Sequence, residues 1–346
     1  MTEKLICVHR GLDSDQGLYW ATNDGGGWTA DTRFSNGADS ANGPALAMFN
    51  GVLYCVHRGG NGSNALWWST FDPANETWSE DTQFAQGNET DSGPAICVFN
   101  GGLYCVHKGH GDYSMWWCQY DQSINQWTAD TQFSQGNETD CQPALISFDN
   151  QLLCVHRGGS GNGLWWCQFT GSDWTGDTAF SQGNETATAP ALAIYQNQLV
   201  CVHRGSGDHN LWWCTYDGGS WTADQQVGGG AVSIEGPGLC AFNGVLWCAH
   251  VLGLNSESGT ADPNATSDYL STMDAAMGGG AALGSFVPLA GDALYAGLTA
   301  SASTAADLKL AYTTLDGLSS SWAPDTLFGQ GNCSNATVAL ATIDLP

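Results

Sequence analysis

The stretch that decides the fold runs from residue 44 to residue 84 and reads PALAMFNGVLYCVHRGGNGSNALWWSTFDPANETWSEDTQF. It contains four short runs rich in β-branched and aromatic residues, and turn residues separate one run from the next. Asn50-Gly51, between the first two runs, is the strongest two-residue signal for a β-hairpin. No part of the stretch has the 3.6-residue periodicity of a helix. The stretch therefore predicts one antiparallel sheet of four short strands.

The same unit recurs at a nearly constant spacing. The histidine of the second run stands at His9, His57, His107, His156, His203 and His250. A unit of about 49 residues fits seven times into the 346 residues, and four-stranded units of this period are typical of propeller blades. We therefore expect an all-β fold, a seven-bladed β-propeller of four-stranded antiparallel blades. It would form a single domain over 1–346, with units at approximately 1–43, 44–93, 94–142, 143–189, 190–236, 237–283 and 284–346.

The last two units are the least regular. GLCAFNGVLWCAH at 238–250 keeps the first two strands of the sixth unit, and DYLSTMD at 268–274 is the expected third strand. The seventh unit is expected to contain ALYAGLTA (293–300), LKLAYTTLD (308–316) and SSWAPDTLFGQGN (320–332). The final NATVALATID matches a first strand, whereas EKLICVHRG at 3–11 matches a second strand. We expect the C-terminal strand to join the N-terminal blade and close the ring, which removes the open sheet edges.

Composition narrows the possible partners. The net charge is -26, from 8 Lys+Arg against 34 Asp+Glu, so phosphate backbones and acidic membrane surfaces are disfavoured. No apolar stretch approaches the roughly 20 residues of a membrane helix, and the N-terminus lacks the features of a signal peptide. We expect a protein that is cytoplasmic or released without a signal peptide, with no nucleic-acid binding and no membrane insertion. Neutral glycans remain as partners, and the oligomeric state is left open.

The 13 cysteines allow two interpretations. Buried free thiols are the usual state of cysteine in a reducing compartment. The alternative is pairing across a hairpin, since three pairs are each 13 residues apart: Cys105/Cys118, Cys154/Cys167 and Cys201/Cys214. The first two units have Ala21 and Ser69 in place of the second cysteine.

The candidate binding site follows from the strand order. In units one to five the second strand ends in His-Arg or His-Lys and the third begins with Leu-Trp-Trp or a close variant, whereas units six and seven lose this set. The connections that follow units two, three and four carry Asn-Glu. Antiparallel order brings these three places to one face of the ring. The predicted ligand-binding residues are His9, Arg10, Trp20, His57, Arg58, Trp68, His107, Lys108, Trp117, His156, Arg157, Trp166, His203, Arg204, Trp213, Asn88, Glu89, Asn137, Glu138, Asn184 and Glu185.

Further aromatic residues accompany this set. Each of the five tryptophans is preceded by Tyr19, Trp67, Trp116, Trp165 or Trp212. The tryptophan at the start of the fourth strand is expected to be structural (Trp28, Trp78, Trp127, Trp174, Trp221 and Trp322). Two structural alternatives stay open for the predicted site. The third-strand tryptophans can pack between blades, and the arginines can pair with Glu89, Glu138 or Glu185.

The chemistry of this set suits sugars. A pyranose stacks its apolar face on an indole ring and directs its hydroxyls to fixed donors and acceptors. One such site is weak, with a Kd on the order of 0.1–1 mM, but repetition around a rigid ring adds avidity. We therefore expect a multivalent lectin with about five similar sites between blades. Protein interaction is the main alternative, as in WD-type propellers.

The pattern P-A-L-A-x-F-N-G-x-L-Y-x-V-x-R-G…L-W-W…W-T-x-D resembles the blade unit of seven-bladed propeller lectins of the PLL type. The resemblance covers nearly the whole chain and is strongest in units one to five. It implies binding of fucose or O-methylated sugars between adjacent blades, without a metal. The C-V-H and Q-G-N-E-T segments lie outside that pattern. Leaderless fungal propeller lectins are a second resemblance, at the level of architecture.

Enzymatic and metal-binding functions are less well supported. TNDGGGW (22–28) and YDGGSW (216–221) faintly resemble the Asp-box of sialidases, but those enzymes need one unique centre of arginines, tyrosine and carboxylate. This sequence repeats its arginines instead, so we expect no enzyme. The histidines lie in different units without a metal-binding spacing, and a pair such as Cys55/His57 would need further ligands to hold zinc. No cofactor and no metal are expected.

Overall fold

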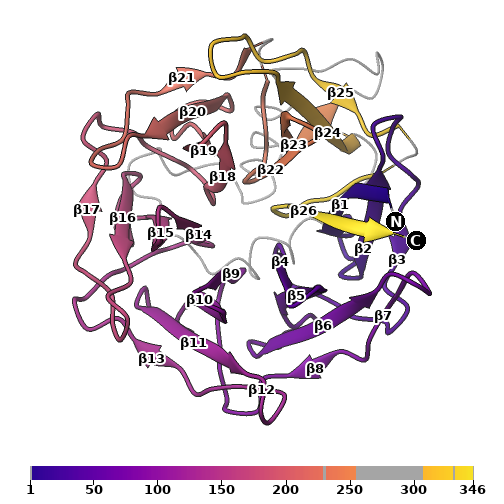
Figure 1. Cartoon of the computed structure of the whole chain (residues 1–346), viewed down its shortest axis with the longest axis vertical. Helices are drawn as coiled ribbons and strands as arrows, with labels where there is room; N and C mark the ends of the chain where they lie inside the picture. The colour runs from indigo at the N-terminus through magenta and orange to yellow at the C-terminus, as the bar shows by residue number, and fades with distance from the viewer. Residues whose placement is uncertain (1, 229–230, 255–306, 330–331, 346) are drawn as a thin grey trace, which may run out of the picture.

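The computed structural model describes residues 2–228, 231–254, 307–329 and 332–345 and shows a β-propeller (Figure 1). Six antiparallel sheets formed by the described residues surround a central axis. The first strand of each blade lies nearest the axis, and the later strands follow outwards. Among the described residues there is no helical segment with the length and apolar character that a membrane crossing requires.

The strands have the following bounds. Blade 1 contains β26 (Ala339–Leu345), β1 (Thr2–Arg10), β2 (Leu18–Asn23) and β3 (Thr32–Arg33). Blade 2 contains β4 (Ala45–Phe49), β5 (Val52–Arg58), β6 (Leu66–Asp72) and a fourth strand split into β7 (Thr77–Trp78) and β8 (Thr82–Gln83). Blade 3 contains β9 (Ala95–Phe99), β10 (Gly102–Lys108), β11 (Met115–Asp121), β12 (Gln126–Trp127) and β13 (Thr131–Gln132).

The other three blades follow the same order. Blade 4 contains β14 (Ala144–Phe148), β15 (Gln151–Arg157), β16 (Leu164–Gln168) and β17 (Thr178–Ala179). Blade 5 contains β18 (Ala191–Tyr195), β19 (Gln198–Arg204), β20 (Leu211–Tyr216) and β21 (Gln225–Gln226). Blade 6 contains β22 (Gly238–Phe242), β23 (Val245–Leu254), β24 (Asp307–Leu315) and β25 (Thr326–Leu327).

The prediction of seven blades is wrong, because the described residues form six. The difference arises in the last blade, where β24 pairs directly with β23 from Leu246↔Leu315 to Leu254↔Asp307. LKLAYTTLD is therefore the third strand of blade 6 and not part of a seventh unit. The segments 268–274 and 293–300, which were expected to form strands, lie outside the described residues. The units expected at 237–283 and 284–346 thus contribute to one blade, with β26 left to complete blade 1.

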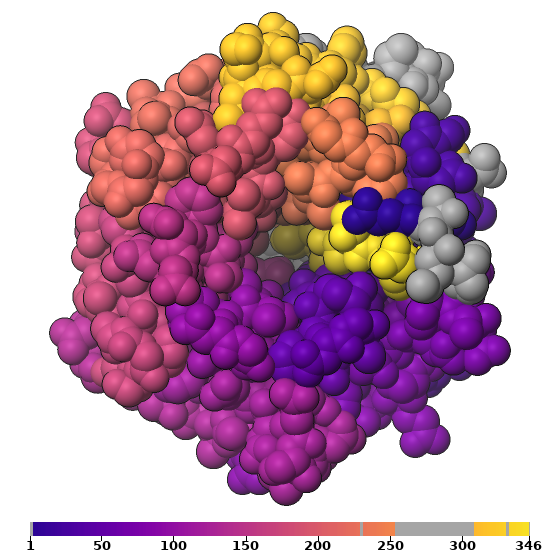
Figure 2. All heavy atoms as spheres, viewed as in Figure 1, coloured from indigo at the N-terminus to yellow at the C-terminus, as the bar shows by residue number. Residues whose placement is uncertain are grey.

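The closure of the ring is as expected. β26 pairs antiparallel with β1, from Thr2↔Leu345 to Val8↔Ala339. The pairing buries Ile343 and Leu345, which are 4% and 2% exposed. Figure 2 shows the indigo and yellow ends of the chain meeting at the surface beside the hollow at the centre of the ring. The blade that contains the N-terminal strand is therefore completed by the C-terminal strand.

The predicted Asn-Gly turns connect the first and second strands. Asn50 and Gly51 have φ angles of 50° and 78°, which is the left-handed pair that a type I′ hairpin requires. Asn100-Gly101 and Asn243-Gly244 have the same conformation. This turn matches the twist of the flanking strands, so it sets their register and hence which side chains face each neighbouring blade.

Aromatic stacking joins the blades at five of the six junctions formed by the described residues. A phenylalanine at the end of one blade stacks on the fourth-strand tryptophan of the following blade. The ring centroids are 4.1 Å apart in Phe34–Trp78, 4.7 Å in Phe84–Trp127, 4.7 Å in Phe133–Trp174, 4.4 Å in Phe180–Trp221 and 4.2 Å in Phe328–Trp28. These tryptophans are all buried, in agreement with the structural role predicted for them. Each stacked pair adds about 0.5–1.5 kcal/mol beyond the area that it buries.

Candidate functional site

The loops and connections predicted to share a face do so. The connection between blades 2 and 3 pairs with the start of β6 through Ala65↔Glu89, and the connection between blades 3 and 4 pairs with the end of β15 through Thr139↔Gly158. We call this surface the connection face. It consists of the inter-blade segments 38–44, 88–94, 137–143, 184–190, 231–237 and 332–338 and the loops 11–17, 59–65, 109–114, 158–163 and 205–210.

The histidines lie beneath the connection face, where a ligand cannot reach them. His9, His57, His107, His156, His203 and His250 are all 0% exposed. Each contacts, through Nε2, an aspartate directly before the outermost strand of its own blade. The distances are 2.9 Å to Asp31, 3.1 Å to Asp81, 3.0 Å to Asp130, 2.9 Å to Asp177, 3.0 Å to Asp224 and 3.2 Å to Asp325. The predicted sugar contacts of His9, His57, His107, His156 and His203 do not fit this geometry, because the rings bind strands together.

The environment of His156 favours its protonated form. Burial would lower the pKa of His156, but hydrogen bonds to Asp177 and Cys167 raise it to about 10. Its Nδ1 lies 3.2 Å from the carbonyl oxygen of Arg157, which accepts the second N–H. Both ring nitrogens are therefore engaged inside the blade.

The predicted asparagines are also interior residues. Asn88, Asn137 and Asn184 are 1–3% exposed. Each amide donates to the histidine-bound aspartate of the following blade: Asp130, Asp177 or Asp224. Asn332, which sequence reasoning did not single out, makes the same bond to Asp31 across the closure of the ring. These asparagines therefore join blades and are unavailable to a sugar.

The third-strand tryptophans of the predicted set pack between blades. Trp20, Trp68 and Trp213 are 5–6% exposed, whereas Trp117 and Trp166 are half-buried. Trp20 meets Phe71 of blade 2 edge-on at 5.1 Å, and Trp68 meets Tyr120 of blade 3 at 5.5 Å. Trp117–Phe169 and Trp166–Tyr216 repeat the contact. The alternative of an inter-blade core is the one that the structure supports for this set.

The cations connect successive inter-blade segments. Arg58 donates to Asn42 Oδ1 at 3.1 Å and to the carbonyl oxygen of Asp91 at 3.1 Å. Arg157 contacts Asp140 Oδ2 at 3.0 Å and donates to the carbonyl oxygen of Ala187. The other cations repeat parts of this pattern, since Arg10 donates to Asn335, Lys108 lies 3.6 Å from Asp91 Oδ2 and Arg204 donates to the carbonyl oxygen of Ile234. These residues shape the floor of the connection face.

The acidic residues of the predicted set remain at the surface. Glu89, Glu138 and Glu185 are exposed, and Glu185 accepts a hydrogen bond from Ser206 Oγ of the next blade at 2.7 Å. The contacts given above for Arg58 and Arg157 are to asparagine and aspartate side chains and to backbone carbonyls. The glutamate carboxylates are thus acceptors that point to solvent at the junctions between blades.

A second row of aromatic residues lies at the connection face. Tyr19, Trp67, Trp116, Trp165 and Trp212 are half-buried, and they pair in register with the buried histidines. A Cβ atom added to Gly59 would lie 2.6 Å from Trp67 Nε1, so the glycine after His-Arg allows the indole to approach the backbone. Gly109, Gly158 and Gly205 make room in the same way for Trp116, Trp165 and Trp212. The glycine that follows each His-Arg or His-Lys pair is the sequence signal for the four tryptophans of this row.

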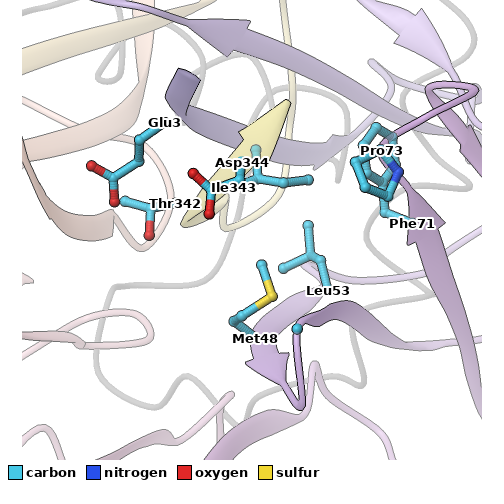
Figure 3. Close-up of a pocket in the computed structure, with 9 residues that line it drawn as sticks. Glu3, Met48, Leu53, Phe71, Pro73, Thr342, Ile343 and Asp344 are labelled. Atoms are coloured by element: carbon cyan, nitrogen blue, oxygen red, sulfur yellow. The ribbon is translucent and has the colours of Figure 1, made fainter. Parts of the chain in front are cut away.

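A cavity lies on the opposite face, between blades 1 and 2 (Figure 3). Its volume is about 180 Å³, and its lining includes Gly51 of a hairpin turn and Pro73. Leu53, Phe71 and Ile343 form buried apolar walls. Glu3 and Asp344 also line it and stand opposite each other on β1 and β26, where two like charges repel. Sequence analysis did not predict this cavity, because it forms only when the ring closes.

The propeller fold is shared with several solved structures. AofleA, a fungal propeller lectin from Arthrobotrys oligospora, has a TM-score of 0.56 at 7% identity, covering 96% of this chain and 84% of that one. A protein of unknown function from Dyadobacter fermentans has a TM-score of 0.54 at 10% identity, covering 72% and 87%. The phage phi92 endosialidase has a TM-score of 0.49 at 10% identity, covering 68% and 57%. No family model and no curated protein matches the chain.

Proposed function

We propose that this protein is a multivalent lectin that binds glycans at the junctions between blades on the connection face. The observation that carries the proposal is the row of half-buried aromatic residues, Tyr19, Trp67, Trp116, Trp165 and Trp212, repeated in five blades. A half-buried indole offers an edge or face to the apolar side of a sugar. Repetition in five blades suits a multivalent ligand such as a cell-surface glycan.

Polar groups beside the aromatic row supply the hydrogen bonds. Glu89, Glu138 and Glu185 offer exposed carboxylate acceptors, and Lys108 and Arg157 are partly accessible donors. The sites differ from the predicted set, because the histidines, the asparagines and most of the paired tryptophans are interior. The fold shared with AofleA supports carbohydrate binding as the function class. Fucose and O-methylated sugars are the first glycans to test, as the resemblance to PLL-type lectins implies.

A glycan array followed by calorimetry tests the proposal. We expect selective binding of one class of terminal sugar, with several sites per chain. Trp116→Ala should lower the number of sites by about one and leave the affinity of the others unchanged, because the sites are separate. Met48→Ala, in the cavity on the opposite face, is the matched control and should bind like the wild type. An array without binding, or an unchanged number of sites in the Trp116→Ala protein, would contradict the proposal.

The proposed lectin does not hydrolyse its ligand. Glycoside hydrolysis needs one acid and one base or nucleophile placed at a single centre, whereas the exposed glutamates of the connection face recur by repetition. Incubation of the bound glycan with the protein should therefore release no free sugar by chromatography. Release of sugar would favour a glycoside hydrolase, and binding of a protein partner with a blank array would favour an interaction scaffold.

A further inference from the structure

Blade 4 contains a buried cluster of three different metal-ligating side chains. The donor atoms of His156 on β15, Cys167 on β16 and Asp177, directly before β17, all lie within 4.8 Å of one another. His156 and Cys167 are 0% and 1% exposed, and the Asp177 side chain is 21% exposed. Nitrogen, sulfur and carboxylate donors are the set that zinc prefers, and in a tetrahedral site such donors lie about 3.3–3.8 Å apart.

The register of the strands produces this cluster. Cys154 stands directly opposite Cys167, and His156 stands opposite Trp165. Side chains two residues apart on a strand share a face, so Cys154, His156 and Cys167 face the same side of the blade. The donor atoms that lie within 4.8 Å of one another are those of His156, Cys167 and Asp177, and Cys154 lies beside them on the same strand face.

Neighbouring groups hold the ligands in a suitable orientation. The Nδ1–H of His156 donates to the carbonyl oxygen of Arg157 at 3.2 Å, which directs Nε2 towards Asp177 and Cys167. A backbone acceptor for the non-ligating nitrogen is a common feature of histidine metal ligands. Asn137 of the preceding blade donates to Asp177 and to the carbonyl oxygen of Thr175. The carboxylate is therefore fixed from the neighbouring blade.

We propose that blade 4 binds a zinc ion through His156, Cys167 and Asp177, whose donor atoms already lie within 4.8 Å of one another, and that the Cys154 side chain turns towards them to supply the fourth ligand. The metal takes the place of the proton between His156 Nε2 and Asp177, and the cysteine thiols release their protons to solvent when they bind as thiolates. Blades 3 and 5 repeat these residue types in the sequence, as Cys105/His107/Cys118/Asp130 and Cys201/His203/Cys214/Asp224, but among the described residues only the blade 4 donors lie within 4.8 Å of one another. Blades 1, 2 and 6 have Ala21, Ser69 and Thr313 at the position of the second cysteine.

The blades that lack the second cysteine provide the test variants. Cys167→Ser makes blade 4 like blade 2, whose fold already accepts a buried serine at Ser69. Ser69→Cys gives blade 2 the complete set with Cys55, His57 and Asp81, and His57 Nε2 already lies 3.1 Å from Asp81. The reduced full-length proteins are loaded with zinc chloride, desalted and measured for zinc per chain. Cobalt loading adds a second readout, since cysteine ligation gives a thiolate-to-cobalt charge-transfer band.

The expected results have opposite signs in the two variants. Relative to the wild type, zinc per chain should fall by about one in Cys167→Ser and rise by about one in Ser69→Cys, with parallel changes in the cobalt band. Retention of no zinc by the wild type would overturn the proposal, and so would equal zinc content in all three proteins. An intact mass lacking two thiol hydrogens, with a Cys154–Cys167 disulfide found by peptide mapping, would also overturn it. The measurements need no glycan, so they do not depend on the proposed lectin function.

Discussion

Buried polar residues in this protein form chains that cross from one blade to the next. Asn137 of the connection after blade 3 donates to Asp177 of blade 4, which also accepts from His156. An unpaired polar group in the interior costs about 1–3 kcal/mol, so each chain fixes the position of two blades relative to each other. Blades 1 and 5 have Ala38 and Ala231 in place of the asparagine, so the fold accommodates alanine at this position.

Replacement of Asn137 by alanine should destabilise the protein by about 1 kcal/mol, because it removes the hydrogen bonds to Asp177 and Thr175 without a steric clash. Urea unfolding followed by tryptophan fluorescence measures the change. Gln135→Ala, in the exposed turn of the same connection, is the control and should unfold like the wild type. Equal stability of the Asn137→Ala and Gln135→Ala proteins would contradict the role assigned to the amide.

Glu235 makes the free energy of unfolding depend on pH. Burial raises its pKa from 4.5 to about 7, although Arg204 and Arg10 oppose the shift. Because the folded state binds the proton more tightly than the unfolded state, the free energy of unfolding falls as pH rises from about 4.5 to about 7. The loss amounts to about 3 kcal/mol at neutral pH. The contribution of this proton is fully present below pH 4.5.

Glu235→Gln should remove this decline. The variant is expected to gain stability over the wild type between pH 5 and pH 8, by up to about 3 kcal/mol, with little difference at pH 5. Urea unfolding at the two pH values measures the gain. Glu80→Gln, at an exposed glutamate, serves as the control. If the wild type is more stable than Glu235→Gln, and by a larger margin at pH 8 than at pH 5, the predicted direction of the pH dependence is wrong.

At the scale of strands, the two rows of tryptophans have different roles. Trp174, at the start of the fourth strand of blade 4, stacks on Phe133 of blade 3 and is 1% exposed. Trp165, on β16 of the same blade, is half-buried at the connection face. The first row holds the outer edges of the blades together, and the second row offers surface to a ligand.

Trp174→Ala should therefore cost about 3–5 kcal/mol of stability, because a large buried aromatic side chain leaves a cavity. Trp165→Ala is the matched variant in the same blade, and we expect it to cost much less because its ring already contacts solvent. Thermal unfolding of the two proteins measures the loss of stability in each. Equal losses would mean that Trp165 is a core residue, and the proposed row of ligand-binding aromatic residues would then lose its basis.

The strands and turns were predictable because their signals are local and repeated. Asn50-Gly51 specifies its hairpin wherever the unit stands, and the repeat supplied several copies of each signal. The blade count was not predictable in the same way. LKLAYTTLD fits a third strand of either a sixth or a seventh unit, and β23 and β24 are separated by more residues than a whole unit. Only the pairing of Leu246 with Leu315 assigns the strand to blade 6.

The strand order places the predicted loops and connections on one face, but many of the predicted side chains lie inside the blades. Both faces of a blade pack against neighbours, so alternation along a strand does not reveal which residues reach solvent. The sequence pattern therefore predicts His57 and Trp68 as ligand-binding residues, whereas in the structure His57 is held by Asp81 and Trp68 packs on Tyr120. The aspartate that binds each histidine is part of the repeated W-T-x-D pattern. Its pairing with the histidine is evident only from the register of the strands in the blade.

At the scale of the whole molecule, one strand pair closes the ring. β26 joins β1 through the pairs from Thr2↔Leu345 to Val8↔Ala339, and it also packs against β4 and β22 on either side. A propeller gains from closure because no blade then has an unpaired inner edge or an uncovered face. The stability of all six blades consequently depends on a segment of seven residues.

Removal of residues 339–345 should open the ring. The exposed edge of β1 and the loss of Ile343 and Leu345 from the core are expected to lower the melting temperature substantially and to promote association. Differential scanning calorimetry and size-exclusion chromatography measure the two effects. Asp344→Asn keeps the strand and removes only the repulsion from Glu3, so this control should not lower the melting temperature. A truncated monomer with the wild-type melting temperature would show that closure contributes little.

The same closure has a consequence for synthesis in the cell. β1 ends at Arg10 and its inner partner β26 begins only at Ala339, so the first blade made by the ribosome is the last that can be completed. At about 5–20 residues per second, the inner edge of β1 waits roughly 15–65 s for its partner. During that time its Leu-Ile-Cys-Val segment is open to other nascent chains on the same polysome. The unpaired edge of β1 is therefore a pairing hazard during synthesis, and it is absent once the ring has closed.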